Sequence, residues 1–302
     1  MKVLMVGATG TYAHLVVPAL KKRNVTVRAL ARDGGKAAIA RQNGADETAI
    51  GDLRDPASLR AALVGVDGVF TLTPAFAPDE SQMGIAMVQA TKEAGVRKLV
   101  FQSAIHPSIA AMVNHRAKQP VEEAIFESGL EYCVLQPTMF MQNLDGAVVS
   151  AKERGVVVTP YSKMSKMCYV DYRDVADVVA LALTSDRLSY GTFELCAPGM
   201  YSPIDLAALL GETLGRRVEA GEIAPAQWAR GLPPGPFGEG LSKMMDHYDH
   251  YGLPGGNALV LSAILERDPR TLREYFSEQA SPESRAFAGG KLDPSLRVQA
   301  VR

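Results

Sequence analysis

The first residues with a recognisable chemistry form a loop near the N-terminus. Gly7, Gly10 and Ala13 follow a short apolar run at residues 3–6 and precede a helical pattern over residues 14–22. A buried strand, a tight turn and a helix start together favour anion binding, because small residues let a pyrophosphate approach unpaired backbone N–H groups. The spacing is GxxGxxA rather than GxGxxG, so an ordinary strand-to-helix turn is the alternative for this loop taken alone.

Basic residues follow the next apolar run, residues 25–30. Arg32 lies just beyond this run, and Lys36 comes four residues later. A protein that prefers NAD carries an acidic residue near this strand end to bind the ribose 2′-hydroxyl, whereas a guanidinium pairs well with a 2′-phosphate. The sequence therefore predicts NADP(H) in preference to NAD(H), the alternative being a solvated surface arginine.

Composition and charge bound the class of protein. The chain has 302 residues, 47% of them hydrophobic and 22% charged, which is ordinary for a globular protein of one large domain or of one domain with an appended cap. A net charge of −1 argues against nucleic acid or an anionic membrane as a main partner. No segment is long enough for a membrane span, and the apolar N-terminus fits a strand better than a signal peptide. Three cysteines in apolar surroundings, Cys133, Cys168 and Cys196, predict reduced buried thiols and a cytoplasmic location.

Strand and helix patterns alternate along the first half of the chain. The expected strands beyond residue 31 are 48–51, 68–73, 98–103 and 132–136, and the expected helices are 56–63, 81–94 and 119–128. This alternation predicts an α/β fold with a doubly wound parallel sheet, which binds ligands at the carboxyl ends of its strands. Those ends are at Gly7–Gly10, Arg32, Asp52, Thr73, Ser103 and Gln136.

The second half is less regular. The chain leaves the sheet over residues 138–166 and returns with a brief strand at 168–170, a helix at 173–184 and a strand at 192–196. An amphipathic helix is expected at 204–215, and a helix containing Met, His and Tyr ends near residue 251.

Seven segments carry a family resemblance. They are GATGTYA (7–13), VRALAR ending at Arg32, GDLRD (51–55), KLVFQSA (98–104), Lys118, LQPTMFMQN (135–143) and YVDYRDVADV (169–178). In order and spacing they resemble the NmrA-like group of atypical short-chain dehydrogenases/reductases, over about residues 1–280. The resemblance implies a Rossmann-type NADP-binding domain with a smaller C-terminal cap. The group includes quinone, azo-dye and other NAD(P)H reductases, and also cofactor-sensing regulators.

The resemblance suggests a division of the chain. A dinucleotide-binding domain is expected over residues 1–200, with the excursion at 138–166 directed toward the cap. A substrate-capping subdomain is expected over 201–280, and a flexible tail over 281–302. Asp171 and Asp174 match family positions that tie the cap to the sheet.

Short-chain reductases generally use a serine, a tyrosine and a lysine, with the tyrosine four residues before the lysine. Ser103 and Lys118 fit the first and last places, but Asn114 stands where the tyrosine would be. His115 is the nearest alternative donor, unless it is an ordinary helix histidine. His106 lies close behind Ser103 and is either a substrate contact or proton donor, or a loop histidine.

The missing tyrosine has a chemical consequence. Hydride delivered to an isolated ketone creates a strongly basic alkoxide, so a proton must arrive with it. Hydride delivered to a quinone gives a phenolate, whose conjugate acid has a pKa of about 10 and which solvent can protonate later. The sequence therefore disfavours simple ketones and leaves quinone-like acceptors feasible.

The resemblance also assigns roles to single residues. Lys118 would hold the nicotinamide ribose and supply positive charge near a developing oxyanion. Ser103 would donate to the acceptor oxygen, or merely end its strand, and Asn143 would cap or contact substrate. The further cofactor contacts expected are Thr9, Thr11, Tyr12, Lys36, Asp52, Leu53, Thr73, Pro74, Gln136, Pro137, Thr138 and Phe140.

Two histidines near residue 250 raise the question of a metal. His247 and His250 are spaced for one helical face but lack a clear third ligand, so no metal site is predicted. With Tyr251, Trp228 and Met244 they are expected to line an apolar pocket or pack the cap.

The leading hypothesis is an NADPH-dependent reductase of quinone-like or other conjugated aromatic acceptors, with direct hydride transfer and no metal or flavin. The alternative is a non-catalytic NADP(H) sensor that binds a protein partner. An isomerase or epimerase with tightly held NAD fits Arg32 and the missing tyrosine less well. The expected partner is a small aromatic or quinone-like substrate, and a homodimer is kept as a candidate assembly.

Overall fold

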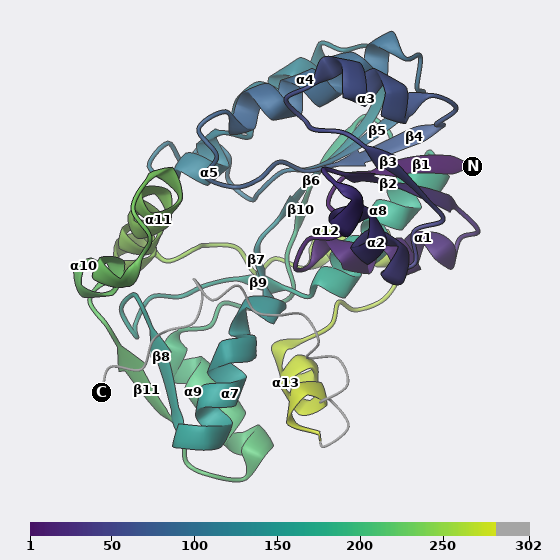
Figure 1. Ribbon diagram of the computed structural model, residues 1–302. Helices are drawn as coiled ribbons and strands as arrows, with labels where there is room; N and C mark the ends of the chain where they lie inside the picture. Colours follow the sequence, from purple (N-terminus) through teal and green to yellow (C-terminus); the bar gives the residue numbers. More distant parts are fainter. Residues whose placement is uncertain (282–302) are drawn as a thin grey trace. The chain divides into compact units, whose positions relative to one another are not determined.

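A computed structural model of the chain describes residues 1–281 (Figure 1). The tail predicted for 281–302 lies, apart from its first residue, outside the described residues. The chain divides into two compact units. The first contains Met1–Ala110, Asn114–Pro137 and Tyr172–Leu195, and the second contains Ala111–Val113, Thr138–Asp171 and the chain from Cys196 onward. The functional division into a dinucleotide-binding domain and a cap stays a prediction, because compactness assigns no role to either unit.

A parallel sheet of seven strands forms the centre of the first unit. Its spatial order is β10-β6-β5-β4-β1-β2-β3, and every neighbouring pair is parallel. The strands are β1 (Lys2–Met5), β2 (Thr26–Ala31), β3 (Glu47–Ile50), β4 (Gly68–Thr71), β5 (Lys98–Gln102), β6 (Glu131–Pro137) and β10 (Gly191–Leu195). The apolar side chains of the central strands β1, β4 and β5 are buried because helices cover both faces, as parallel sheets require. The predicted doubly wound α/β fold is confirmed.

The helices of this unit form two layers, which Figure 1 shows on opposite sides of the sheet. On one face α3, α4 and α6 pack together, and on the other α1 packs against α8. The helices are α1 (Val16–Lys21), α2 (Gly34–Gln42), α3 (Pro56–Leu63), α4 (Glu80–Glu93), α5 (Val113–Arg116), α6 (Gln119–Phe126) and α8 (Tyr172–Thr184). The core under the first layer joins Leu99 and Phe101 of the sheet to Leu59, Met87 and Val121 of the helices.

One glycine sets the approach of α4 to α6. A Cβ atom on Gly84 would lie 2.5 Å from Cγ2 of Val121 and 3.3 Å from Cγ2 of Thr73. These distances are far shorter than an ordinary van der Waals contact, so only glycine allows this separation of the two helices. Side chains at the start of α4 and the start of α6 are thereby brought within reach of one another.

Several boundaries differ from the sequence-based expectation. The helix expected from residue 14 begins with a 3-10 turn at Ala13–Leu15, and α1 starts only at Val16. Pro18, which has no N–H to donate and restricts the residue before it, accounts for this irregular first turn. The strand expected over 68–73 ends at Thr71, so Thr73 lies in the loop that follows β4.

The second unit contains elements that the sequence did not reveal. The excursion at 138–166 holds β7 (Met139–Phe140), a 3-10 turn at Met141–Leu144, α7 (Asp145–Arg154) and β8 (Val156–Thr159). β7 pairs in parallel with β9 (Tyr169–Val170), and β8 pairs in parallel with β11 (Glu219–Glu222). The other elements are α9 (Pro203–Leu214), α10 (Pro225–Trp228), a 3-10 turn at Ala229–Gly231, α11 (Pro236–Tyr251), α12 (Leu259–Leu265) and α13 (Leu272–Ala280). Short strands next to a helix carry too weak a periodicity to be distinguished from loops.

The packing expected for the end of α11 is wrong in part. Its buried side is formed by Leu241, Met245 and Tyr248, which follow one another at helical spacing. The His250 side chain is 61% exposed and Tyr251 is 74% exposed, so neither packs into the core of the unit. His250 lies on the opposite side of the helix from the buried residues, and Tyr251 is the last residue of the helix.

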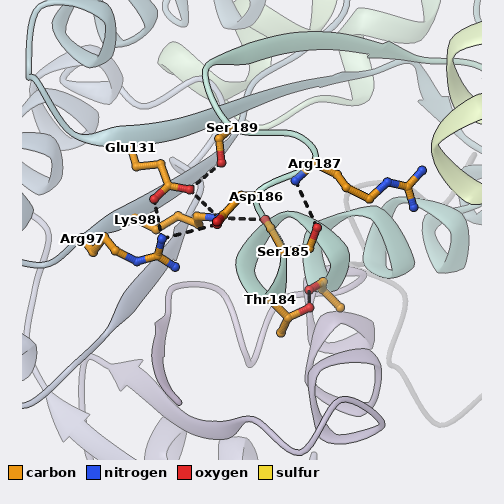
Figure 2. Close-up of polar contacts among 9 residues, drawn as sticks. Arg97, Lys98, Glu131, Thr184, Ser185, Asp186, Arg187 and Ser189 are labelled. Carbon is orange, nitrogen blue, oxygen red and sulfur yellow. Dashed lines mark hydrogen bonds and ion pairs between the residues drawn. The ribbon is translucent and has the colours of Figure 1, made fainter.

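An ionic cluster around one buried lysine lies where β5 and β6 begin (Figure 2). Lys98, 1% exposed, places its ammonium 2.6 Å from Glu131 and 3.1 Å from Asp186, and donates to the Ser185 carbonyl at 2.8 Å. Arg97 joins the same two carboxylates at 2.6 and 3.4 Å. All three hydrogens of the Lys98 ammonium are therefore used, which is how a buried cation is tolerated.

The state of the cysteines and the hydropathy of the helices can be compared with the sequence-based predictions. Cys133, Cys168 and Cys196 are buried and unbridged, as predicted. Burial raises the pKa of the Cys133 thiol to about 12, so this thiol stays neutral. Within residues 1–281, no helix combines the length and the hydropathy that crossing a membrane demands.

Candidate active site

The glycine loop follows β1 directly and is tightly folded. Gly7 has a φ of 88°, and its carbonyl accepts a hydrogen bond from Gly10 N at 2.8 Å. A Cβ atom on Gly7 would lie 3.1 Å from Leu72 and 3.2 Å from Ala13, so glycine meets both a conformational and a packing demand. Asn43, at the end of α2, donates from its side chain to the carbonyl of Ala8 at 2.9 Å. Because α1 has only six residues, the loop itself rather than a long helix dipole offers the backbone N–H groups.

Two cations stand just beyond the end of β2. Arg32 is exposed and Lys36 half-buried. Asp33 is occupied with capping α2, since its side chain accepts from the backbone N of Lys36 at 2.8 Å. Across residues 1–281 neither the Arg32 guanidinium nor the Lys36 ammonium has a hydrogen-bond or ion-pair partner. Both cations are therefore available to an external anion.

The cofactor contacts expected after β3 and β4 differ in how deeply they are buried. Asp52 accepts from the backbone N of Arg54 at 2.9 Å, whereas Leu53 is buried in the core. Pro74 is exposed, and Thr73 is buried. In the glycine loop Thr11 is exposed, and the Tyr12 ring lies 6.2 Å from that of Tyr172.

Lys118 lies immediately before α6 and is 6% exposed. Its ammonium is 2.5 Å from Oε1 of Glu80 and donates to Oγ1 of Thr73 at 2.7 Å. Glu80 is the first residue of α4 and only 2% exposed, and its other oxygen accepts from the backbone N of Phe76 at 2.9 Å. One carboxylate thus joins the loop after β4 to the lysine. An ammonium has three hydrogens, and within the described chain Lys118 uses two.

Ser103 and Gln136 meet at a second buried carboxylate. The Ser103 hydroxyl lies 2.5 Å from Oε1 of Glu122, and the Gln136 amide donates to the two oxygens of Glu122 at 2.9 and 3.2 Å. Ser103 follows β5, Gln136 is near the end of β6, and Glu122 lies on α6. With its hydrogen directed to Glu122, Ser103 presents its oxygen lone pairs to any ligand in this arrangement.

Lys118 pairs with a glutamate of α4 and not with the glutamate four residues further along the chain in α6. Lys118 and Glu122 are four residues apart, with Glu122 N donating to Lys118 O at 2.9 Å, a spacing at which opposite charges on a helix often pair. The ammonium is instead paired with Glu80 of α4. Gly84, one turn further along α4, permits this by letting α4 approach α6.

The histidines near Ser103 are differently placed. His115 is buried, and its Nδ1 donates to the carbonyl of Ile105 at 2.5 Å, which joins α5 to the segment after β5. His106 has a φ of 51°, and its Nδ1 lies 3.8 Å from a carboxylate oxygen of Glu194 in β10. In its described part the chain has no group of three or more His, Cys, Asp or Glu residues arranged to hold a metal.

Three of the expected contacts belong to the second unit. The Thr138 hydroxyl donates to the Cys168 carbonyl at 2.9 Å, Phe140 is in β7, and Asn143 is exposed. Asp171, fully buried, accepts from the Gln142 amide at 2.9 Å. These contacts hold the second unit together.

Sequence reasoning missed the two buried carboxylates. Glu80 follows Pro78 and Asp79 at a helix start, where an acidic residue is expected for the helix dipole alone. Glu122 carries a signal that could have been used, since it stands one helical turn after Lys118 inside an apolar pattern. Burial separates both from ordinary surface glutamates, and burial follows from the packing of α4 against α6.

Comparison with known proteins adds to this geometry. A family model described as the NmrA-like family matches residues 1–276. The NAD(P)H azoreductase of Xenophilus azovorans is 33% identical over 286 residues, which cover 94% of this chain and 99% of the azoreductase.

Two solved structures show the same fold. An NADPH-dependent quinone oxidoreductase from Escherichia coli, solved with NADPH, has a TM-score of 0.79 at 22% identity, covering 92% of this chain and 100% of that one. NmrA, a negative transcriptional regulator solved with NADP, has a TM-score of 0.75 at 18% identity, covering 97% and 98%.

Proposed function

The chain belongs to the NmrA-like family, and from that premise we propose that it is an NADPH-dependent reductase acting on quinone-like or other conjugated aromatic acceptors. The observation that carries the proposal is the buried Lys118 ammonium, fixed by Glu80 and Thr73 with one hydrogen left for a ligand. A similar azoreductase and a similarly folded quinone oxidoreductase support the same class of reaction.

The first unit offers residues that fit a phosphorylated dinucleotide. The Gly7–Gly10 loop would take the pyrophosphate, since its backbone is folded without side chains in the way. Arg32 and Lys36 would take the 2′-phosphate, because a guanidinium and an ammonium without protein partners suit a dianion. These two residues support a preference for NADPH over NADH.

Bound NADPH supplies the hydride. Lys118 would donate its remaining hydrogen to the nicotinamide ribose, and its ion pair with Glu80 would hold the ammonium in one position. The same ion pair limits the charge that Lys118 presents, so positioning outweighs the oxyanion stabilisation that the sequence suggests for it.

The acceptor class follows from the proton requirement. Asn114 stands in place of the tyrosine, and the Ser103 hydroxyl donates its hydrogen to Glu122, so neither of these two positions supplies a proton to the acceptor. Acceptors whose reduced form is a weak base, such as quinones, need none during hydride transfer.

Loss of NADPH absorbance on mixing with a panel of quinones and azo dyes tests the proposal, with NADH in parallel. Turnover faster with NADPH is expected. Arg32→Ala should weaken NADPH binding about tenfold, the loss expected for a charge-assisted phosphate contact, and leave NADH binding nearly unchanged. Equal effects on both cofactors would contradict the role of Arg32.

A cofactor-sensing regulator is the second candidate, favoured by the likeness of fold to NmrA with NADP. Tight NADPH binding without turnover across the panel would favour it over the reductase. Lys118→Met would then leave binding of a protein partner intact, whereas in a reductase it lowers kcat by about 100-fold.

A further inference from the structure

The buried charges around Lys118 do not balance. Lys118 is paired with Glu80, and this pair is close to neutral. Glu122 adds a second carboxylate, 8% exposed, on the same face of α6. Within residues 1–281, no ammonium, guanidinium or imidazole lies within ion-pair distance of Glu122. The cluster at the carboxyl ends of β4, β5 and β6 therefore carries one uncompensated negative charge.

The hydrogen bonds of Glu122 satisfy its oxygens without cancelling that charge. Its three contacts come from the Ser103 hydroxyl at 2.5 Å and the Gln136 amide at 2.9 and 3.2 Å, and both groups are neutral donors. Acceptance by both oxygens is the bonding pattern of an ionised carboxylate. A charge held in this way in a poorly polarisable interior acts on its surroundings more strongly than a surface charge.

A cation formed beside this cluster would be stabilised. When hydride leaves NADPH, both electrons of its C–H bond go with it to the acceptor, and one positive charge stays on the nicotinamide ring. The ring is neutral before the step and cationic after it, so a fixed carboxylate nearby favours the oxidised form.

We propose that Glu122 sets the balance between oxidised and reduced dinucleotide at this site by electrostatic stabilisation of the cationic ring. The proposal rests on the proposed function, because it requires the ring to lie beside Ser103 and Gln136. It concerns the departure of hydride and is therefore independent of the acceptor. Ser103 and Gln136 act as positioning residues that hold the carboxylate in place.

Separate dissociation constants for NADP⁺ and NADPH, measured by titration of the purified protein without an acceptor, test this proposal. In Glu122→Gln the ratio of the NADP⁺ constant to the NADPH constant should rise at least tenfold, because a unit charge within about 12 Å of the ring contributes about 1.4 kcal/mol or more at an effective dielectric constant of about 20. The NADPH constant itself should change little. Glu122→Met should give the same ratio, so a folding failure of one variant leaves the other.

Two further variants make the test specific. Ser103→Ala removes a hydrogen bond and keeps the charge, so its ratio should stay within about twofold of the wild type, a change of roughly 0.4 kcal/mol. Lys118→Met removes a cation from the cluster and should move the ratio in the opposite direction.

The outcomes separate this proposal from the proposed function. A wild type that binds both dinucleotides, with an unchanged ratio in Glu122→Gln and Glu122→Met, would overturn the role of Glu122 and leave the reductase proposal standing. An equal shift in Ser103→Ala would also overturn it, because geometry rather than charge would then be responsible. A wild type that binds neither dinucleotide would overturn both.

Discussion

Two lysines of the first unit are almost completely buried, and they lie at opposite ends of the same strands. Lys98 is the first residue of β5, where its ammonium meets Glu131, Asp186 and the Ser185 carbonyl (Figure 2). Every hydrogen of this ammonium has a protein partner. Such saturation leaves nothing for a ligand, and the cluster joins the starts of β5 and β6 to the end of α8.

Lys118 lies at the other end, beyond the carboxyl ends of the strands. Its ammonium has Glu80 and Thr73 as partners among residues 1–281 and keeps one hydrogen unused. A buried lysine thus has a structural role at residue 98 and a proposed cofactor-binding role at residue 118, and the number of ammonium hydrogens with protein partners distinguishes the two positions. Burial of a lysine alone would not have distinguished structure from function.

Lys98→Met should produce the largest loss of stability. It removes one of the two cations that lie 2.6 Å from Glu131, whose side chain is 13% exposed, and leaves Arg97 as the other. Breaking a buried pair costs about 3–5 kcal/mol, and the remaining Arg97 contact places the expected loss at the lower end, about 3 kcal/mol. Urea denaturation measures this loss, and NADPH affinity of the folded protein should be unchanged. A variant that unfolds normally but binds NADPH poorly would contradict the division between the two lysines.

Lys118→Met should affect turnover most. Removing a preorganised donor lowers kcat by about 100-fold, roughly 2.7 kcal/mol. Steady-state reduction of a quinone with NADPH measures it. Lys92→Met, which removes an exposed lysine of α4, is the matched control and should leave kcat unchanged. A similar loss in both variants would mean that general charge, not position, matters.

Gly84→Ala should weaken the Lys118–Glu80 ion pair indirectly, through the packing of α4 against α6. The new methyl group meets Val121 at 2.5 Å, and overpacking of this kind costs about 1–3 kcal/mol. Because α4 must move away from α6, Glu80 is drawn from Lys118 and NADPH affinity should fall as well. Thermal unfolding and NADPH titration measure the two effects.

A control for the glycine is available in α7. Gly146 has open space around its Cβ position, so Gly146→Ala should be neutral or stabilising. The double variant Gly84→Ala with Val121→Ala should recover NADPH affinity. Failure of this rescue would show that the helix separation does not control the lysine.

Asp186→Asn should have the smallest effect, and one that depends on pH. Hydrogen bonds from Lys98 and Arg97 lower the pKa of the Asp186 carboxyl below its ordinary value of 3.8. A carboxyl whose pKa is lower in the folded state adds stability above its unfolded pKa, and this stability disappears as pH falls through the lowered pKa. Asp186 is 76% exposed, so solvent weakens the contribution.

Urea midpoints at neutral pH and near pH 3 measure this contribution. The wild type should lose more stability than Asp186→Asn between the two conditions. An identical loss would show that Glu131 alone balances Lys98.

The sequence was sufficient for the sheet and for the family. Alternating apolar runs and helical patterns predicted the strands of the first unit to within one or two residues, because buried parallel strands are continuous apolar runs. The largest difference, two residues, was in the 68–73 run, where Thr73 lies beyond the strand and its hydroxyl bonds Lys118 and Glu80. In the second unit β8 and β11 were missed. β11 reads Glu-Ala-Gly-Glu and has no large apolar side chain, and β8, although it begins with three valines, is only four residues long.

The site was only partly predictable for a different reason. Ser103 and Gln136 were named from their places at strand ends and Lys118 from the family resemblance, but Glu80 and Glu122 were not named. A glutamate becomes informative only when packing buries it, and the packing of α4 on α6 depends on a single hydrogen atom at Gly84 in place of a side chain. The roles of all these residues stay predictions until binding is measured.

The pairing of Lys118 also bears on how the chain folds. While α6 forms alone, Glu122 is the nearest opposite charge to Lys118, and only the arrival of α4 replaces it with Glu80. The local pairing preference of Lys118 therefore differs from its pairing in the folded structure, a conflict that sequences selected to fold smoothly keep to a minimum. A conflict of this kind is expected at functional residues, which agrees with the role proposed for Lys118. In an isolated peptide spanning residues 116–127, we expect the Lys118–Glu122 pair to raise the helix content. Added salt should lower that helix content, because it screens the ion pair.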